Sequence, residues 1–246
     1  MKVYSLKKHF LELKTRILRI LLVFITIFII CYYFSEDIYN ISLYPLLKLS
    51  DNGTRRIIYT GLTEAFFTYV KLAAFSSFVI TLPVISLEIY FFISPGLYKH
   101  EKKIAACILF LSTILFWFGV VFVYYYVIPT AWRYFLSFEY RKIDAIPIIL
   151  EARISEYLNL VIRLIVAFGM AFQIPIFMLI LSLMKVIKAS DLKKNRRLAI
   201  VINFIIAGIL APPDIISQFI LAIPMLLLYE ISIILCKYLE NRKKEC

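Results

Sequence analysis

Six long apolar runs constrain the fold of this 246-residue chain more than any other feature of its sequence. About 20 apolar residues in a helix cross the ~30 Å hydrocarbon core of a bilayer, because each residue adds about 1.5 Å. Since 62% of the residues are hydrophobic, too few polar residues remain to cover a water-facing surface. The sequence therefore predicts a single integral membrane domain over residues 1–246. Its expected spans are roughly 17–34, 66–94, 104–132, 154–184, 198–210 and 215–236.

The spans are expected to be helices. A chain in lipid has to pair its backbone polar groups internally, and no run shows the alternating pattern of a barrel strand. The predicted fold class is thus all-α, a polytopic membrane protein with two short C-terminal spans. The fifth run ends at Pro212 and Pro213, which stop a helix before Asp214 can cap the next one.

Three further prolines, Pro83, Pro129 and Pro175, lie inside the second, third and fourth runs and are expected to kink them. The connecting segments 35–64 and 133–153 hold apolar residues, which predicts short helices lying in the membrane interface.

The distribution of charge predicts the orientation. Segments 1–19, 99–103, 185–197 and 237–246 carry 19 Lys and Arg residues against five acids. On the other side of the membrane, segments 36–64, 133–153 and 211–214 carry seven basic residues against eight acids. Because basic loops stay in the cytoplasm, both termini are expected to be cytoplasmic. The net charge of +12 then needs no nucleic acid to explain it.

The sequence lacks the residues that several classes of protein need. The first apolar run is too long for a cleaved secretory signal, and no small-residue cleavage site precedes Ser35. The four cysteines show no CxxC spacing, which argues against a metal site or a disulfide framework. Phosphate-loop, HExxH and GxSxG motifs are absent, so we expect neither an enzyme nor a cofactor.

Polar residues inside apolar runs are candidates for function, because a charge in hydrocarbon is costly. Glu88 is the most notable, since an acid there needs a partner, water or a raised pKa; an arginine or lysine from a neighbouring helix is the alternative to a functional role. Lys71 and Glu64 are two turns apart, and an ion pair between them is one explanation for Lys71. The other candidates are Glu156, Arg163, Gln173, Asn203, Gln218 and Glu230.

Five motifs occur in one order along nearly the whole chain. They are HFLEL at 9–13, SPGLYKHEKK at 94–103, AFGMAFQIP at 167–175, PPDIISQ at 212–218 and LAIPMLLLYE at 221–230. Together they resemble the TatC family, the multispanning core of the twin-arginine protein translocase.

The resemblance implies a six-helix, glove-shaped receptor for folded proteins that carry an S/T-R-R-x-F-L-K type signal peptide. The signal-binding pair falls on Phe92 and Glu101, with Glu12 as a second acid. The histidines His9 and His100, which lie beside these acids, and Glu88 complete the expected signal-peptide site. Glu88 stands where the resemblance predicts a glutamine.

Other positions take roles from the same resemblance. Gln173 is the intramembrane polar residue, and Pro45 is the proline of the first outer loop. The expected docking site for a partner helix comprises Gln218, Asp214, Pro212 and Pro213. The implied partners are TatA/TatB-like single-span proteins and further copies of the receptor, in a bacterial cytoplasmic membrane or its organellar equivalent. The implied energy source is the proton motive force.

The chemistry of the acids agrees with this interpretation. Arginine presents a planar fork that pairs with a carboxylate through two parallel hydrogen bonds, and lysine does not. The main alternative is a secondary transporter or channel that uses Glu88, Arg163 and Asp214 as an ion path. Such a protein is expected to pass solute by itself, whereas a receptor binds signal peptide without flux.

Overall fold

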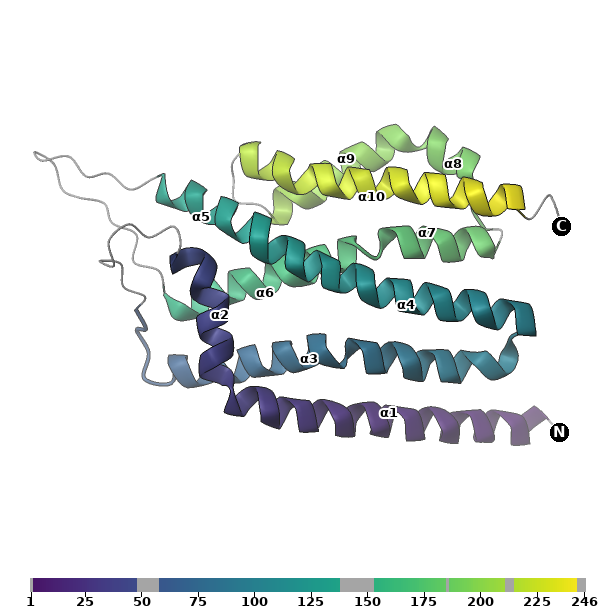
Figure 1. Ribbon diagram of the computed structural model, residues 1–246, viewed down its shortest axis with the longest axis horizontal. Coiled ribbons are helices and arrows are strands. Elements are labelled where there is room, and N and C mark those ends of the chain that lie inside the picture. The colour runs from purple at the N-terminus through teal and green to yellow at the C-terminus, as the bar shows by residue number, and fades with distance from the viewer. Residues whose placement is uncertain (1, 48–57, 138–152, 185, 211–214, 243–246) are drawn as a thin grey trace, which may run out of the picture. The chain divides into compact units, whose positions relative to one another are not determined.

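The computed structural model describes residues 2–47, 58–137, 153–184, 186–210 and 215–242. Within these ranges every regular element is a helix, and the only β pairing is an isolated bridge between Ile58 and Arg153 (Figure 1). The α-helices are α1 Lys2–Tyr33, α2 Ser35–Leu47, α3 Glu64–Ile93, α4 Lys99–Phe122, α5 Ile128–Leu136, α6 Ile154–Ala171, α7 Ile174–Leu183, α8 Ala189–Lys194, α9 Arg196–Leu210 and α10 Ile215–Arg242. The predicted all-α class is confirmed.

Four stretches are long and apolar enough to cross a membrane, namely Phe10–Tyr33, Glu64–Gly96, Lys102–Leu136 and Ile154–Leu183. They match the first four predicted spans. In the most apolar part of the first stretch only 6% of the residues are buried. Its apolar side chains therefore face outward, as contact with lipid requires. The segments predicted as the fifth and sixth spans are helical: they form α9, with 15 residues, and α10, which continues past residue 236 to Arg242. Neither helix is among the four stretches found in the described residues.

The chain divides into two compact units. The first comprises Met1–Tyr44, Ile58–Ile114 and Arg153–Leu158, and the second comprises Pro45–Ile57, Leu115–Ala152 and Asn159–Cys246. In the first unit, α1 and α3 lie side by side and run in opposite directions (Figure 1).

Helix α2 also belongs largely to the first unit and confirms the helix predicted in segment 35–64, over residues 35–47. Its Tyr39 ring meets the ring of Tyr69 edge-on with centroids 5.6 Å apart, and burial next to Tyr69 raises the pKa of Tyr39 to about 12. The hydroxyl of Tyr157 donates to the carbonyl of Ser42. The helix expected in 133–153 lies mostly outside the described residues.

Glu64 holds the start of α3 to the start of α6. One of its carboxylate oxygens accepts from the amides of Thr60 and Gly61 at 2.8 and 3.1 Å, and the other accepts from the Ser155 hydroxyl at 2.5 Å. The ion pair considered between Glu64 and Lys71 does not occur among the described contacts, because Glu64 is engaged with these donors and Lys71 is exposed.

In the second unit, α10 packs against α7, α8 and α9 (Figure 1). Its buried face includes Leu221, Met225 and Ile233. The hydroxyl of the buried Tyr229 donates to the carbonyl of Leu192 in α8 at 2.9 Å.

Near two of the three prolines expected to kink their helices, the regular α-helix is interrupted. Pro175 has no N–H to donate, and the helix breaks just before it, where the Gln173 amide turns to the carbonyl of Met170 at 2.9 Å. A π-helical turn at Val123–Val127 precedes Pro129. By contrast, α3 continues as one helix through Pro83.

Candidate functional site

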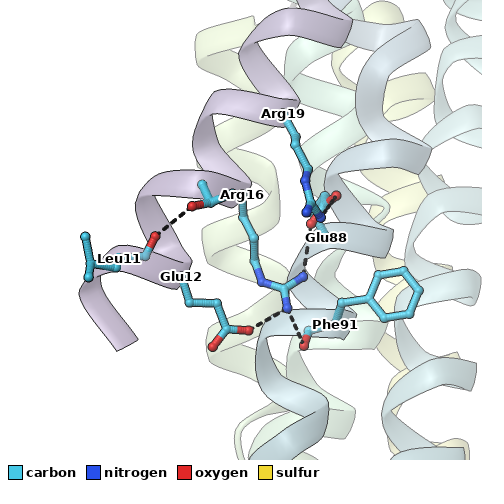
Figure 2. Close-up of polar contacts among 7 residues, drawn as sticks. Leu11, Glu12, Arg16, Arg19, Glu88 and Phe91 are labelled. Atoms are coloured by element: carbon cyan, nitrogen blue, oxygen red, sulfur yellow. Dashed lines mark hydrogen bonds and ion pairs between the residues drawn. The ribbon is translucent and has the colours of Figure 1, made fainter. Parts of the chain in front are cut away.

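The antiparallel packing of α1 on α3 brings two acids and two arginines together (Figure 2). Glu12, Arg16 and Arg19 are spaced by four and three residues, so they share one face of α1. Glu88, near the C-terminal end of α3, lies opposite them. We call these four residues the acid–arginine cluster.

Arg16 is the centre of this cluster. One of its terminal nitrogens donates to the Glu12 carboxylate at 2.6 Å and to the backbone carbonyl of Phe91 at 3.0 Å. Its other terminal nitrogen donates to the Glu88 carboxylate at 3.0 Å. The guanidinium thus spans two carboxylates and a carbonyl, from two helices.

Arg19 approaches the second oxygen of Glu88 at 3.7 Å. The Glu88 side chain is only 14% exposed and that of Arg16 15%, whereas Arg19 is 62% exposed. A carboxylate withdrawn from solvent to this degree needs compensating charge and hydrogen bonds. The two arginines provide both, and the cluster carries no net charge.

The cluster accommodates a guanidinium without saturating it. The Nε of Arg16 is buried and has no hydrogen-bond partner, so the side chain leaves one donor unused. Glu12 is the more accessible acid, with 36% of its side chain exposed. A carboxylate beside a backbone carbonyl is an arrangement that favours the planar fork of arginine over the point charge of lysine.

Sequence reasoning did not single out Arg16 or Arg19. Their spacing from Glu12 along one helix face, and the lone acid Glu88 in another span, were the available indications. The alternative for Glu88, an ion pair with a basic residue of a neighbouring helix, is what the structure contains.

The other residues predicted to bind signal peptide lie at the same end of the first unit. Phe92 is half-buried and follows Phe91, whose carbonyl contacts Arg16. A short 3₁₀ turn at Ser94–Gly96 then leads into α4. Glu101 and His100 belong to the first turn of α4, and His9 belongs to α1 near its N-terminus. The side chains of these last three residues lie outside the described part of the structure.

The predicted intramembrane polar residue, Gln173, is half-buried at the break between α6 and α7. Its backbone carbonyl accepts from the Phe177 amide at 2.9 Å and so begins α7. Pro45 is buried within α2.

Of the predicted docking residues, only Gln218 is described; Pro212, Pro213 and Asp214 lie outside the described residues. The Gln218 amide nitrogen donates to the carbonyl of Phe204 at 2.9 Å and thereby joins α10 to α9. Glu230, another polar candidate, pairs with Arg196 of α9 at 2.7 Å.

Among the residues that the structure describes, no group of three or more His, Cys, Asp or Glu side chains could hold a metal ion.

Comparison with known proteins identifies the family of this chain. A family model described as Sec-independent protein translocase protein (TatC) matches residues 8–224. The chain belongs to the TatC family. The TatC protein of Rickettsia prowazekii is 65% identical over 241 residues, covering 98% of this chain and 96% of the relative. TatC of Escherichia coli K12 is 34% identical over 230 residues, covering 94% and 87%.

A crystal structure described as the twin-arginine translocase receptor TatC is similar to this TatC chain, with a TM-score of 0.73 and 36% identity. The match covers 94% of the chain and 98% of the solved structure. This chain is therefore a helical membrane protein and a component of a protein translocase, which is the role that its motifs predicted.

Proposed function

We propose that this TatC chain is the receptor and core subunit of a twin-arginine protein translocase, acting as a single integral membrane domain. It binds the signal peptide where α1 begins, α3 ends and α4 begins. At this end of the first unit lie Glu12, Phe92 and Glu101, the residues to which the family motifs assign signal binding.

The observation that carries the proposal is the guanidinium already present between Glu12 and the Phe91 carbonyl, at 2.6 and 3.0 Å. The groups that hold it are the ones that a signal arginine needs, since a carboxylate and a carbonyl both accept from its fork of donors. Phe92 then supplies a half-buried aromatic surface for the apolar part of the peptide.

The charge distribution supports a position of this end of the first unit at the cytoplasmic face. The 19 basic residues of the segments flanking the spans on this side, against five acids, support an orientation with both termini in the cytoplasm. The relatives are bacterial, which supports the inner membrane as the location.

The second unit offers a surface for the single-span TatA/TatB-like partners. Helix α9 exposes 57% of Ile205 and 74% of Ile209, while Gln218 ties the same helix to α10. A partner helix in lipid packs by close contact and hydrogen bonding rather than by hydrophobic burial. Self-association in a receptor complex depends on the same close contacts and hydrogen bonds between helices.

Site-specific photocrosslinking tests the proposal. A photoreactive residue introduced at Phe92 or at Glu101 of the purified chain in lipid nanodiscs should crosslink to a labelled twin-arginine peptide. Glu101→Gln should reduce binding by about tenfold, because it removes one charge-assisted contact near a boundary where screening is weak.

Glu156→Gln is the matched control. It also removes one carboxylate, but Glu156 is 72% exposed at the opposite end of the first unit and contacts only Arg153, at 3.7 Å, among the described ion pairs. Its binding should equal that of the wild type. Crosslinks that are equally strong from position 156, or unchanged binding in Glu101→Gln, would contradict the proposed site.

A further inference from the structure

We propose that Arg16 is a built-in competitor for the acid that binds the signal arginine, and that Glu88 holds this competitor partly away from Glu12. The inference rests on the proposed function, because it assigns Glu12 to the signal peptide. It adds two residues that set the affinity of that site.

The competitor has the same chemistry as the ligand. A signal arginine needs the Glu12 carboxylate, and the Arg16 guanidinium already occupies one oxygen of that carboxylate at 2.6 Å (Figure 2). Arg16 is four residues from Glu12 on the same helix, so its guanidinium stays within reach of the Glu12 carboxylate. An incoming peptide therefore exchanges one guanidinium for another, and binding is weaker than an unoccupied carboxylate would allow.

Glu88 limits the strength of this competition. It accepts from one terminal nitrogen of Arg16 at 3.0 Å, so that the two terminal nitrogens cannot both pair with Glu12. The two parallel bonds that an arginine can form with one carboxylate are thus divided between two acids. Without the charge of Glu88, both terminal nitrogens would be free to turn to Glu12.

A carboxylate at position 88 holds Arg16 more firmly than an amide would. A neutral amide accepts hydrogen bonds more weakly than a carboxylate and brings no charge. With Glu88 present, the enclosed Arg16 has a second anionic partner, and Arg19 compensates Glu88 in turn at 3.7 Å. The receptor keeps Glu12 more readily available to its ligand.

A purely structural role for the cluster predicts different results. If the ion pairs only fasten α1 to α3, then every variant that breaks them loosens the site and weakens binding or leaves it unchanged. Competition instead predicts that removing Arg16 strengthens binding, and that the effect of altering Glu88 depends on whether Arg16 is present.

The experiment measures the affinity of a fluorescent twin-arginine peptide for the purified full chain in nanodiscs, as the wild type and in five variants. Arg16→Gln should bind about fivefold more tightly than the wild type, the gain expected from removing one partly exposed ion-pair partner. Glu88→Gln should bind several-fold more weakly, because Arg16 is left to Glu12. Arg19→Gln should gain less than about twofold, since it contacts Glu88 and not Glu12 in the described structure.

The double variant Arg16→Gln/Glu88→Gln guards against misfolding, because it leaves no enclosed charge without its partner. Competition predicts that it binds at least as tightly as the wild type, so that the loss caused by Glu88→Gln disappears when Arg16 is also replaced. If the double variant binds as weakly as Glu88→Gln alone, or if Arg16→Gln and Arg19→Gln gain equally, the competition is refuted.

The failure of this inference is distinct from the failure of the proposed function. If the wild type does not bind the twin-arginine peptide, or if Glu12→Gln binds as well as the wild type, the proposed site itself is wrong. If the wild type binds, Glu12→Gln weakens binding and Arg16→Gln does not strengthen it, only the role of Arg16 as competitor is overturned.

Discussion

Gly169 of α6 is the position where one added methyl group should be most damaging. A Cβ atom built there would lie 2.4 Å from Cε2 and 2.8 Å from Cζ of the Phe116 ring in α4. Ordinary contacts of a Cβ atom are 3.4–4 Å, so the ring has to move by about 1 Å or more. We therefore predict that Gly169→Ala destabilises the second unit.

The magnitude follows from two opposing effects. Alanine is favoured over glycine inside a helix by about 1 kcal/mol, whereas forcing an extra carbon into a packed contact costs about 1–3 kcal/mol. The expected net loss for Gly169→Ala is up to about 2 kcal/mol. The unfolding midpoint should fall by about 2–4 °C for each kcal/mol.

Thermal unfolding of the purified protein in detergent, followed by the labelling of buried cysteines such as Cys236, measures this loss. Gly119→Ala is the graded control, because its nearest contact, Cδ2 of Phe172, lies at 3.1 Å; the change should be close to neutral. Adding Phe116→Leu to Gly169→Ala removes the outer ring atoms and should restore part of the stability. A midpoint that rises in Gly169→Ala would refute the close packing of α4 on α6 in this unit.

Three further predictions concern single polar contacts. Tyr229→Phe removes the hydrogen bond to the Leu192 carbonyl and should cost about 1 kcal/mol of unfolding free energy, measured in the same thermal assay. Arg196→Gln should change the free energy of unfolding by less than about 1 kcal/mol, since both side chains of its pair with Glu230 are nearly half exposed. A larger loss would contradict the view that this pair is a weak surface ion pair. Glu64→Ala should speed hydrogen exchange at the amides of Thr60 and Gly61 without affecting amides in the middle of α3; unchanged exchange there would show that Glu64 is not their acceptor.

Four of the expected spans were predictable from the sequence, because the length and apolarity of a run decide whether a helix can cross a bilayer. The break before Pro175 was predictable because the missing N–H of proline acts locally, within one turn of the helix. The π-helical turn at Val123–Val127 was not predicted, because proline at 129 permits either a kink or a widened turn.

The composition of the acid–arginine cluster was only partly predictable. Glu12 and Glu88 were singled out from the sequence, but the choice of partner depends on how far α1 slides along α3, which no local pattern fixes. One turn of displacement would bring other residues of α1 opposite Glu88. In the same way, Lys71 matched Glu64 in spacing, yet Glu64 bonds to backbone amides and to Ser155 from another segment.

In the proposed receptor, carboxylates of this TatC chain recognise the guanidinium groups of consecutive arginines. The most direct test compares the affinity of the purified chain for a twin-arginine peptide with its affinity for the same peptide carrying two lysines. Both peptides have the same charge, so only the shape of the donor groups differs. Recognition by a fork predicts that the lysine peptide binds about tenfold or more weakly, and equal affinities would contradict it.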